Sequence, residues 1–69
     1  MNILKINGKE RTFPEQFPGT IMELLTKLKI SEATVVAEID GKIVRRKDFA
    51  QTSVRPGQSI ELVRLVGGG

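Results

Sequence analysis

Several residue types are missing from this 69-residue chain, which has no cysteine, histidine, tryptophan or tyrosine. Without cysteine it can form neither a disulfide nor a thiolate metal site. Without histidine it lacks the commonest general base and the commonest metal ligand. A catalytic pocket would also consume the core that so short a chain needs for stability. The composition therefore argues against an enzyme.

Charge and hydrophobic runs are also limited. Eleven Lys and Arg against eight Asp and Glu give a net charge of only +3, which favours nucleic acid weakly. The aromatic residues are three phenylalanines, a poor supply of stacking platforms for single strands. No apolar run reaches about 18 residues and no signal-like leader is present. We expect a cytoplasmic protein that binds neither nucleic acid nor membrane.

The first twelve or so residues indicate a β-hairpin. Leu4 and Ile6 alternate with Ile3 and Lys5, as in a strand with one buried face. Asn7-Gly8 follows, a dipeptide that tolerates the positive φ angles of a two-residue turn. The spacing predicts a returning strand over 10–13.

A short amphipathic helix comes next. Thr20 and Glu23 match a capping box, in which two side chains satisfy backbone amides at a helix start. The apolar residues that follow recur at i, i+3, i+4 and i+7: Ile21, Leu24, Leu25 and Leu28. A helix of about ten residues is marginal alone, so this stripe is expected to pack on a sheet.

The rest of the chain indicates more strands. TVVAEIDGKIV is typical of strand, Asp-Gly turn and strand, and Phe49 should anchor the polar segment after it. Pro56-Gly57 is typical of a type II turn before a last strand over 60–66. Glu38, Asp40 and Asp48 are interpreted as turn and surface residues. No metal site is expected.

The element order predicts an α+β fold. One helix can cover only one face of the sheet. If the last strand pairs in parallel with the first, the helix and second hairpin form the crossover between them. This is the β-grasp, or ubiquitin-like, arrangement: a mixed sheet of four to five strands with a helix on one face. We assign residues 1–66 to this domain.

The remaining residues, 67–69, are three glycines that we interpret as a flexible C-terminal tail. Extended, they would span roughly 10 Å. Without side chains they could thread a channel too narrow for other residues. The reactive group would be the carboxylate of Gly69, which ATP can activate as an acyl adenylate. A partner enzyme must supply the nucleotide pocket, because the chain has no phosphate-binding loop of its own and is expected to bind no cofactor.

The whole chain resembles the ThiS family of sulfur carriers, from NILKINGK through TIMELL and VAEIDGKIVRR to RPGQSIELVRLVGGG. The resemblance implies that a ThiF-like enzyme adenylates Gly69 with ATP and that a sulfur donor enzyme then helps convert it to a thiocarboxylate. It further implies that a ThiG-like thiazole synthase receives the sulfur, and that Gly67 and Gly68 enter the partners' active sites. The chain would be a protein co-substrate without catalysis of its own.

A docking surface is expected beside the tail. If Leu4 and Ile60 face the helix, Ile3, Val63 and Leu65 face the uncovered side. Parallel neighbours would bring these three together as an apolar patch. Arg64 is expected to join a nearby basic group, Arg45-Arg46-Lys47, that could meet an acidic partner. Scattered exposed aliphatic residues and a solvated basic loop remain the simpler interpretations.

Other functions stay open. The same chemistry would serve a carrier for molybdopterin, tRNA thiolation or cysteine synthesis. A ubiquitin-like modifier would instead end in an isopeptide bond, and an RNA-binding β-grasp module would bind with steep salt dependence and be indifferent to the tail. A terminal Gly-Gly-Gly could also be a cloning linker.

Overall fold

The computed structural model describes residues 2–65, which form a five-stranded mixed sheet with one α-helix. The strands and helix are β1 (Ile3–Ile6), β2 (Lys9–Thr12), α1 (Ile21–Leu28), β3 (Val35–Ile39), β4 (Lys42–Val44) and β5 (Ser59–Arg64). Two short 3₁₀ turns are η1 (Glu32–Thr34) and η2 (Arg46–Asp48). The sheet order is β2-β1-β5-β3-β4, and only β1 and β5 run parallel. The predicted β-grasp fold is confirmed.

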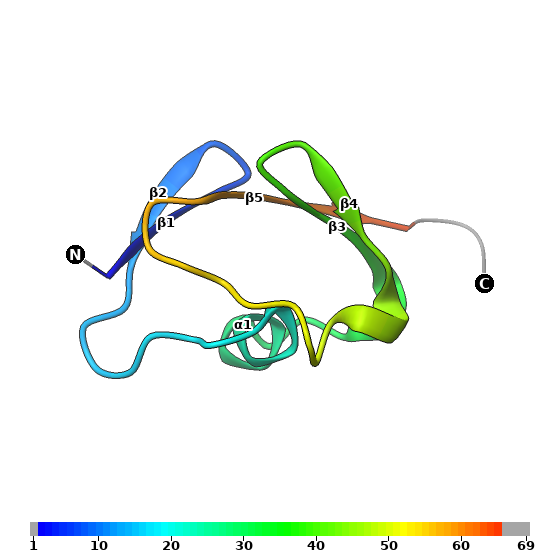
Figure 1. The fold of residues 1–69 in the computed structure, drawn as a ribbon, viewed down its shortest axis with the longest axis horizontal. Coiled ribbons are helices and arrows are strands. Elements are labelled where there is room, and N and C mark those ends of the chain that lie inside the picture. The colour runs from blue at the N-terminus through cyan, green and yellow to red at the C-terminus, as the bar shows by residue number, and fades with distance from the viewer. Residues whose placement is uncertain (1, 66–69) are drawn as a thin grey trace.

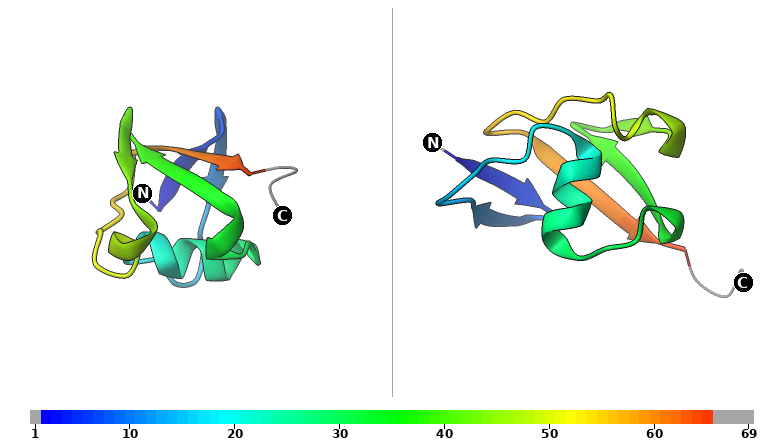
Figure 2. Two further views of the ribbon diagram at one scale, coloured as in Figure 1. Left: turned by 90° about the vertical axis from the view of Figure 1, so that its right-hand side faces the viewer. Right: turned by 90° about the horizontal axis from the view of Figure 1, so that it is seen from below.

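The last strand occupies the centre of the molecule. Figure 1 shows β5 running between the two hairpins, with β1 starting at one end of the molecule and β5 finishing at the other. In Figure 2 the helix crosses one face of the sheet, and the segment before β5 passes beside it. Among residues 2–65, no helix has the length and apolar character needed to cross a membrane.

Both hairpin turns form because their residues accept positive φ. Asn7 and Gly8 have φ of 52° and 84°, and Asp40 and Gly41 have φ of 50° and 87°. These values match the type I′ turn, whose twist fits two antiparallel strands. Asn and Asp are the non-glycine residues that enter this region most readily, so both dipeptides predict their turns from local chemistry alone.

The helix begins at the predicted cap. The Glu23 amide donates to Thr20 Oγ1 over 3.2 Å, and the Gly19 amide donates to a Glu23 carboxylate oxygen over 2.6 Å. The second bond reaches one residue further back than in the usual capping box. At the other end Lys29 adopts φ 59°, and the Ile30 amide donates to the Leu25 carbonyl over 2.9 Å, which closes the helix as glycine often does.

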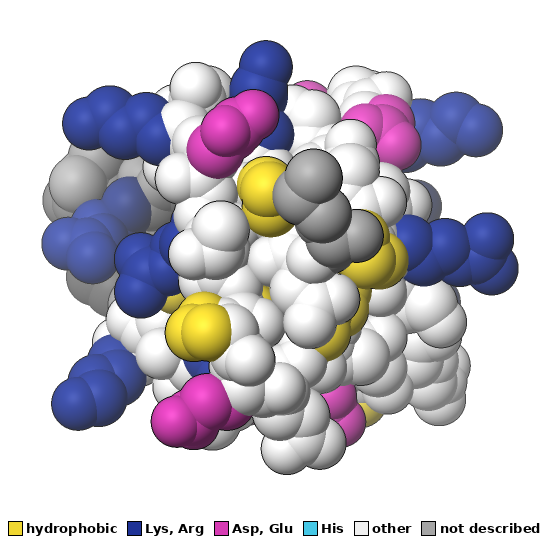
Figure 3. Space-filling view, turned by 90° about the vertical axis from the view of Figure 1, so that its left-hand side faces the viewer, with side chains coloured by type: hydrophobic (Ala, Val, Ile, Leu, Met, Phe, Trp, Pro, Cys, Tyr) yellow, Lys and Arg dark blue, Asp and Glu magenta, His cyan; other side chains and the backbone are white. Residues whose placement is uncertain are grey.

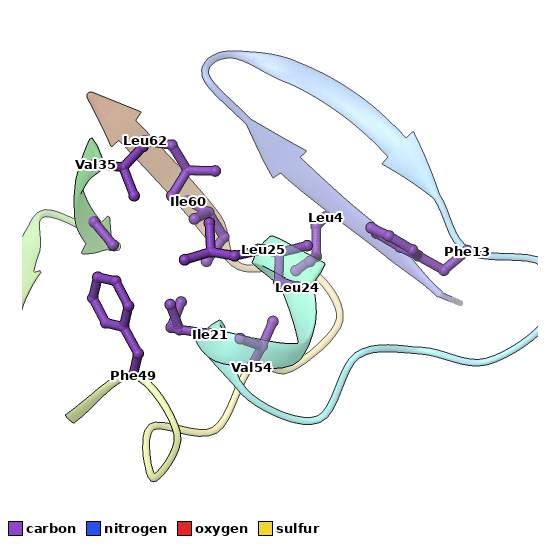
Figure 4. Close-up of a cluster of buried hydrophobic side chains, with 11 residues drawn as sticks. Leu4, Phe13, Ile21, Leu24, Leu25, Val35, Phe49, Val54, Ile60 and Leu62 are labelled. Atoms are coloured by element: carbon purple, nitrogen blue, oxygen red, sulfur yellow. The ribbon is translucent and has the colours of Figure 1, made fainter. Parts of the chain in front are cut away.

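The core lies between the helix and one face of the sheet (Figure 4). Its buried hydrophobic residues are Leu4, Phe13, Ile21, Leu24, Leu25, Val35, Ala37, Phe49, Val54, Ile60 and Leu62. Phe49 closes one end of the core and is fully buried, while Phe13 lies at the other end. The expected anchoring role of Phe49 is confirmed.

Two strand boundaries differ from the sequence-based expectation. The second strand covers Lys9–Thr12, one residue earlier than predicted. Phe13 follows it with its amide still bonded to the Asn2 carbonyl over 2.9 Å, and its ring packs edge-to-face on Phe17 at 5.7 Å. The last strand begins at Ser59, where the amide donates to an Asp40 carboxylate oxygen over 2.9 Å. Its predicted end at Val66 falls outside the described residues.

Candidate docking site beside the tail

The described chain ends next to the start of β3. The Leu65 amide donates to the Thr34 carbonyl over 2.7 Å, so the backbone is tied to the sheet up to this residue. The predicted working residues Gly67, Gly68 and Gly69, and the domain boundary before them, lie outside the described residues. What the structure provides is the surface around Leu65, the last described residue.

An apolar patch lies on the uncovered face of the sheet at this end. Among the described residues, the exposed large hydrophobic side chains are Ile43, Val63 and Leu65, at 68%, 53% and 57% exposure. Val63 pairs directly with half-buried Val36 on β3. Ile43 is opposite Glu38 and therefore diagonal to Val36 on the same face. We call Val36, Ile43, Val63 and Leu65 the tail-end patch.

The structure corrects the expected position of Ile3. The parallel register sets Ile6 opposite Ile60, and the Gly57 amide donates to the Ile3 carbonyl over 2.7 Å. Ile3 therefore lies beside the residues before β5, about 20 Å along the strand from Val63 at the usual rise per residue. The prediction that these two side chains form one patch is wrong. Figure 3 shows the end of the molecule where β1 begins, with separate hydrophobic groups among Lys and Arg side chains.

Arg64 is also placed differently from the expectation. It pairs with Val35, a core residue, so its side chain leaves β5 on the helix side of the sheet. There it lines a groove together with Arg11. Arg45 and Arg46 instead line a separate hollow with Leu65. The predicted grouping of Arg64 with the basic loop is wrong, because consecutive strand residues point to opposite faces.

Two patch residues were missed in the sequence. Val36 and Ile43 each lie in a short run after a turn signal, and alternation alone could have placed them opposite the core face. Their proximity to Val63 could not be predicted from the sequence, because it depends on the pairing of β3 with the C-terminal part of β5. The order and register of these strands would have supplied the missing signal.

Within residues 2–65 no polar or charged residue is buried. No group of three or more Asp or Glu side chains in this part of the chain is arranged to hold a metal ion. What this arrangement can do is present a surface to another molecule: an apolar patch on one face and an arginine-lined groove on the other.

Comparison with known proteins gives consistent matches. The ThiS family model matches residues 4–69. The chain is 28% identical over 67 residues to the sulfur carrier protein ThiS of Bacillus subtilis, covering 97% of this chain and 100% of that one. It is also 36% identical over 66 residues to a thiazole synthase of Paramagnetospirillum magneticum. That match covers 96% of this chain but only 20% of the synthase, so the chain spans about a fifth of that relative's length.

The fold is shared with solved structures from Geobacter metallireducens. A crystal structure of its thiamine biosynthesis protein ThiS matches with a TM-score of 0.82 and 34% identity, covering 97% of this chain and 99% of that one. A solution structure of a thiamine biosynthesis protein from the same organism matches with a TM-score of 0.79 and 36% identity, covering 100% and 88%. The similarity therefore extends over the sheet, the helix and both hairpins.

Proposed function

The chain belongs to the ThiS family and is a sulfur carrier of thiamine biosynthesis, and we propose that it carries the sulfur on the terminal carboxylate of Gly69. The family match extends to this residue. The single observation that carries the proposal is that β5 ends at Arg64 and that the next residue, Leu65, is an exposed member of the tail-end patch. A partner that binds the patch would therefore hold the residues after Leu65 in its own active site.

Activation of Gly69 requires a partner with ATP. The carboxylate attacks the α-phosphate, pyrophosphate leaves, and an acyl adenylate forms. Sulfide from a sulfur donor enzyme then displaces AMP, which leaves a thiocarboxylate. We assign the first step to a ThiF-like adenylating enzyme. Because ATP is supplied in the cytoplasm, we place the carrier there.

Delivery requires a second partner. We assign it to a ThiG-like thiazole synthase, which takes sulfur from the thiocarboxylate and returns the carboxylate. The thiazole synthase relative supports this assignment, because a segment similar to this chain forms about a fifth of it. Gly67 and Gly68 are proposed to enter the active sites of both enzymes, since a chain without side chains fits a narrow channel.

The tail-end patch is proposed as the docking surface for these partners. It extends across β3, β4 and β5 to Leu65, and its Ile43, Val63 and Leu65 side chains are exposed. Apolar groups on an open sheet face are typical of interaction surfaces. Each Å² of apolar surface buried in a complex would contribute about 25 cal/mol to association. Ile3 has no part in it, because it lies at the other end of β5.

The test is intact-mass measurement after incubation with ATP, the adenylating enzyme of the same organism and its sulfur donor. Replacing one oxygen by sulfur should add about 16 Da, and deleting Gly68 and Gly69 should abolish this change without lowering thermal stability. Ile43→Ser should slow the reaction while Lys42→Ser, an exposed neighbour on β4, should not. Sulfur loading of the truncated chain would refute the proposal.

The rival functions have distinct outcomes in the same experiment. A ubiquitin-like modifier would form adducts of higher mass on other proteins. An RNA-binding module would bind RNA equally well without its last two residues. A carrier for another pathway would gain the same 16 Da but fail to support thiazole formation by the purified synthase. The family match favours thiazole formation over these alternatives.

A further inference from the structure

The two sides of β5 are paired to different extents. On one side, β3 pairs with β5 from Ile60 to Arg64. On the other, the strand register of β1 ends where Ile6 meets Ile60. The Asn7 side chain extends this side by one step, because its Oδ1 accepts from the Leu62 amide at 2.7 Å and its Nδ2 donates to the Leu62 carbonyl at 3.2 Å.

Beyond Leu62 the β1 side of the strand is open. Backbone groups of alternate strand residues point the same way, so the N–H and C=O of Arg64 point toward the side that Asn7 covers at Leu62. Within residues 2–65, no residue of β1 or β2 pairs its backbone with Arg64. An unpaired strand edge of this kind is a template for an added strand.

A groove of about 340 Å³ lies along this open edge. Its lining comes from the first hairpin, the end of the helix and the residues just after it, β3 and β5: Ile6, Asn7, Arg11, Leu28, Ile30, Val35, Leu62 and Arg64. Two of these residues carry positive charge and none carries a carboxylate. Arg11 reaches the groove from the edge strand β2, where it pairs with buried Leu4 and so points to the helix side.

We propose that an extended segment of the thiazole synthase, carrying an Asp or Glu side chain, adds as a strand at Arg64 and lies in this groove. This inference rests on the proposed function. The added strand would pair with the Arg64 backbone. The carboxylate of the added strand would bind Arg11 and Arg64, and its apolar side chains would cover Leu28 and Ile30. Guanidinium groups favour carboxylates because two parallel hydrogen bonds can form.

The synthase is favoured as the occupant for two reasons. A segment similar to this chain occurs within a thiazole synthase, so the two units belong to one polypeptide in that relative. The strand edge at Arg64 also leads directly to Gly69, five residues later in the sequence. A partner strand paired there would set the direction in which the tail enters the synthase. This groove lies on the opposite face of the sheet from the tail-end patch.

The experiment measures the dissociation constant of the full carrier with purified thiazole synthase at two salt concentrations. Arg64→Gln and Arg11→Gln should each raise Kd about tenfold or more, as expected when a charge-assisted hydrogen bond is lost. Arg55→Gln is the matched control, since it removes the same charge from an exposed loop residue before β5. It should leave Kd within about twofold, and the salt dependence should weaken only in the two groove variants.

The strand pairing has its own readout. The Arg64 amide should exchange slowly with deuterium in the complex and rapidly in the carrier alone. Arg64→Pro should weaken binding more than Arg64→Gln, because it also removes the edge N–H, which makes no bond to β3. Thermal unfolding of each variant shows whether the fold is intact. Unchanged Kd in both arginine variants, or no protection of the Arg64 amide, would overturn the inference.

Other results separate this inference from the proposed function. If the arginine variants bind the synthase normally but bind the adenylating enzyme weakly, the groove serves that enzyme and our choice of occupant is wrong. If they bind the synthase normally while tail deletion still abolishes sulfur loading, the function stands and the groove inference fails. If the groove variants lose binding but no 16 Da species forms in the wild type, the carrier proposal fails instead.

Discussion

The two hairpins of this protein look alike in sequence but support the central strand differently. Each turns on a two-residue Asn-Gly or Asp-Gly pair, and each turn residue bonds to β5: Asn7 to Leu62 and Asp40 to Ser59. The first hairpin then reaches only the beginning of β5, whereas the second accompanies it to Arg64. In Figure 1 the turns of both hairpins lie above β5, and the left view of Figure 2 shows them on opposite sides of it.

This difference separates two roles. The second hairpin pairs with β5 as far as Arg64, and its outer face supplies two of the four residues of the tail-end patch, Val36 and Ile43. The first hairpin stops short and leaves a strand edge and a groove beside Arg64. Similar turn chemistry therefore produces a continuous docking surface on one side of β5 and an open edge on the other.

The largest expected effect is at the residue that both hairpins share. Ile60 is fully buried, pairs with Ile6 on one side and Ile39 on the other, and lies in the core. Ile60→Ala should reduce the free energy of unfolding by about 2–5 kcal/mol, because it removes buried methyl groups and leaves a cavity. Urea denaturation measures this loss. Ile43→Ala, at an exposed position, should change it by less than about 0.5 kcal/mol. Equal effects would contradict the assignment of the two faces.

An intermediate effect should distinguish the two turn residues. Asn7→Asp keeps the turn and the acceptor but replaces the donor to the Leu62 carbonyl with a second oxygen. It should cost about 1–2 kcal/mol of unfolding free energy. Asp40→Asn keeps the oxygen that accepts from the Ser59 amide, so it should cost at most about 0.5 kcal/mol. Chemical denaturation of both variants provides the comparison, and a larger loss for Asp40→Asn would reverse our ranking of the two turns.

The smallest effects should come from charges on the strands. In the first hairpin Lys5 is opposite Glu10, a favourable pair, while across β3 and β5 Glu38 is opposite Glu61, a like-charged pair. Glu61→Gln should therefore stabilise the fold and Glu10→Gln should destabilise it, each by about 0.2–1 kcal/mol. Unfolding at low and high salt checks this, since added salt should shrink both changes. Changes of the same sign would refute the pairing argument.

The local elements were predictable because each depends on residues close together in the chain. Thr20 with Glu23 determines where the helix begins, and the stripe from Ile21 to Leu28 determines which side it buries. The β-grasp arrangement was predicted on the condition that the last strand pairs in parallel with the first, and the structure contains this pairing. The strand ends were less accurate: the second strand lies one residue earlier than predicted, and the last begins at Ser59.

The candidate site was predicted only in part, because it depends on register. Alternation placed Val63 and Leu65 on the uncovered face. It could not show that the pairing of β1 with β5 stops at Ile60, which leaves Ile3 at the far end of the sheet from Val63. Nor could it show that Ile43 joins the patch or that Arg64 shares a groove with Arg11. These positions are fixed by pairings between residues far apart in the chain.

The sequence alone thus determined the elements and the face that most of them bury, because propensity, capping and alternation act over a few residues. The family was indicated separately, by the resemblance of the whole chain. The tertiary structure decided how far each neighbour follows β5. That extent depends on where the Asn7 amide meets Leu62 and where β3 meets Arg64. Such long-range contacts form only when the whole sheet assembles, and they determine which surfaces border the tail.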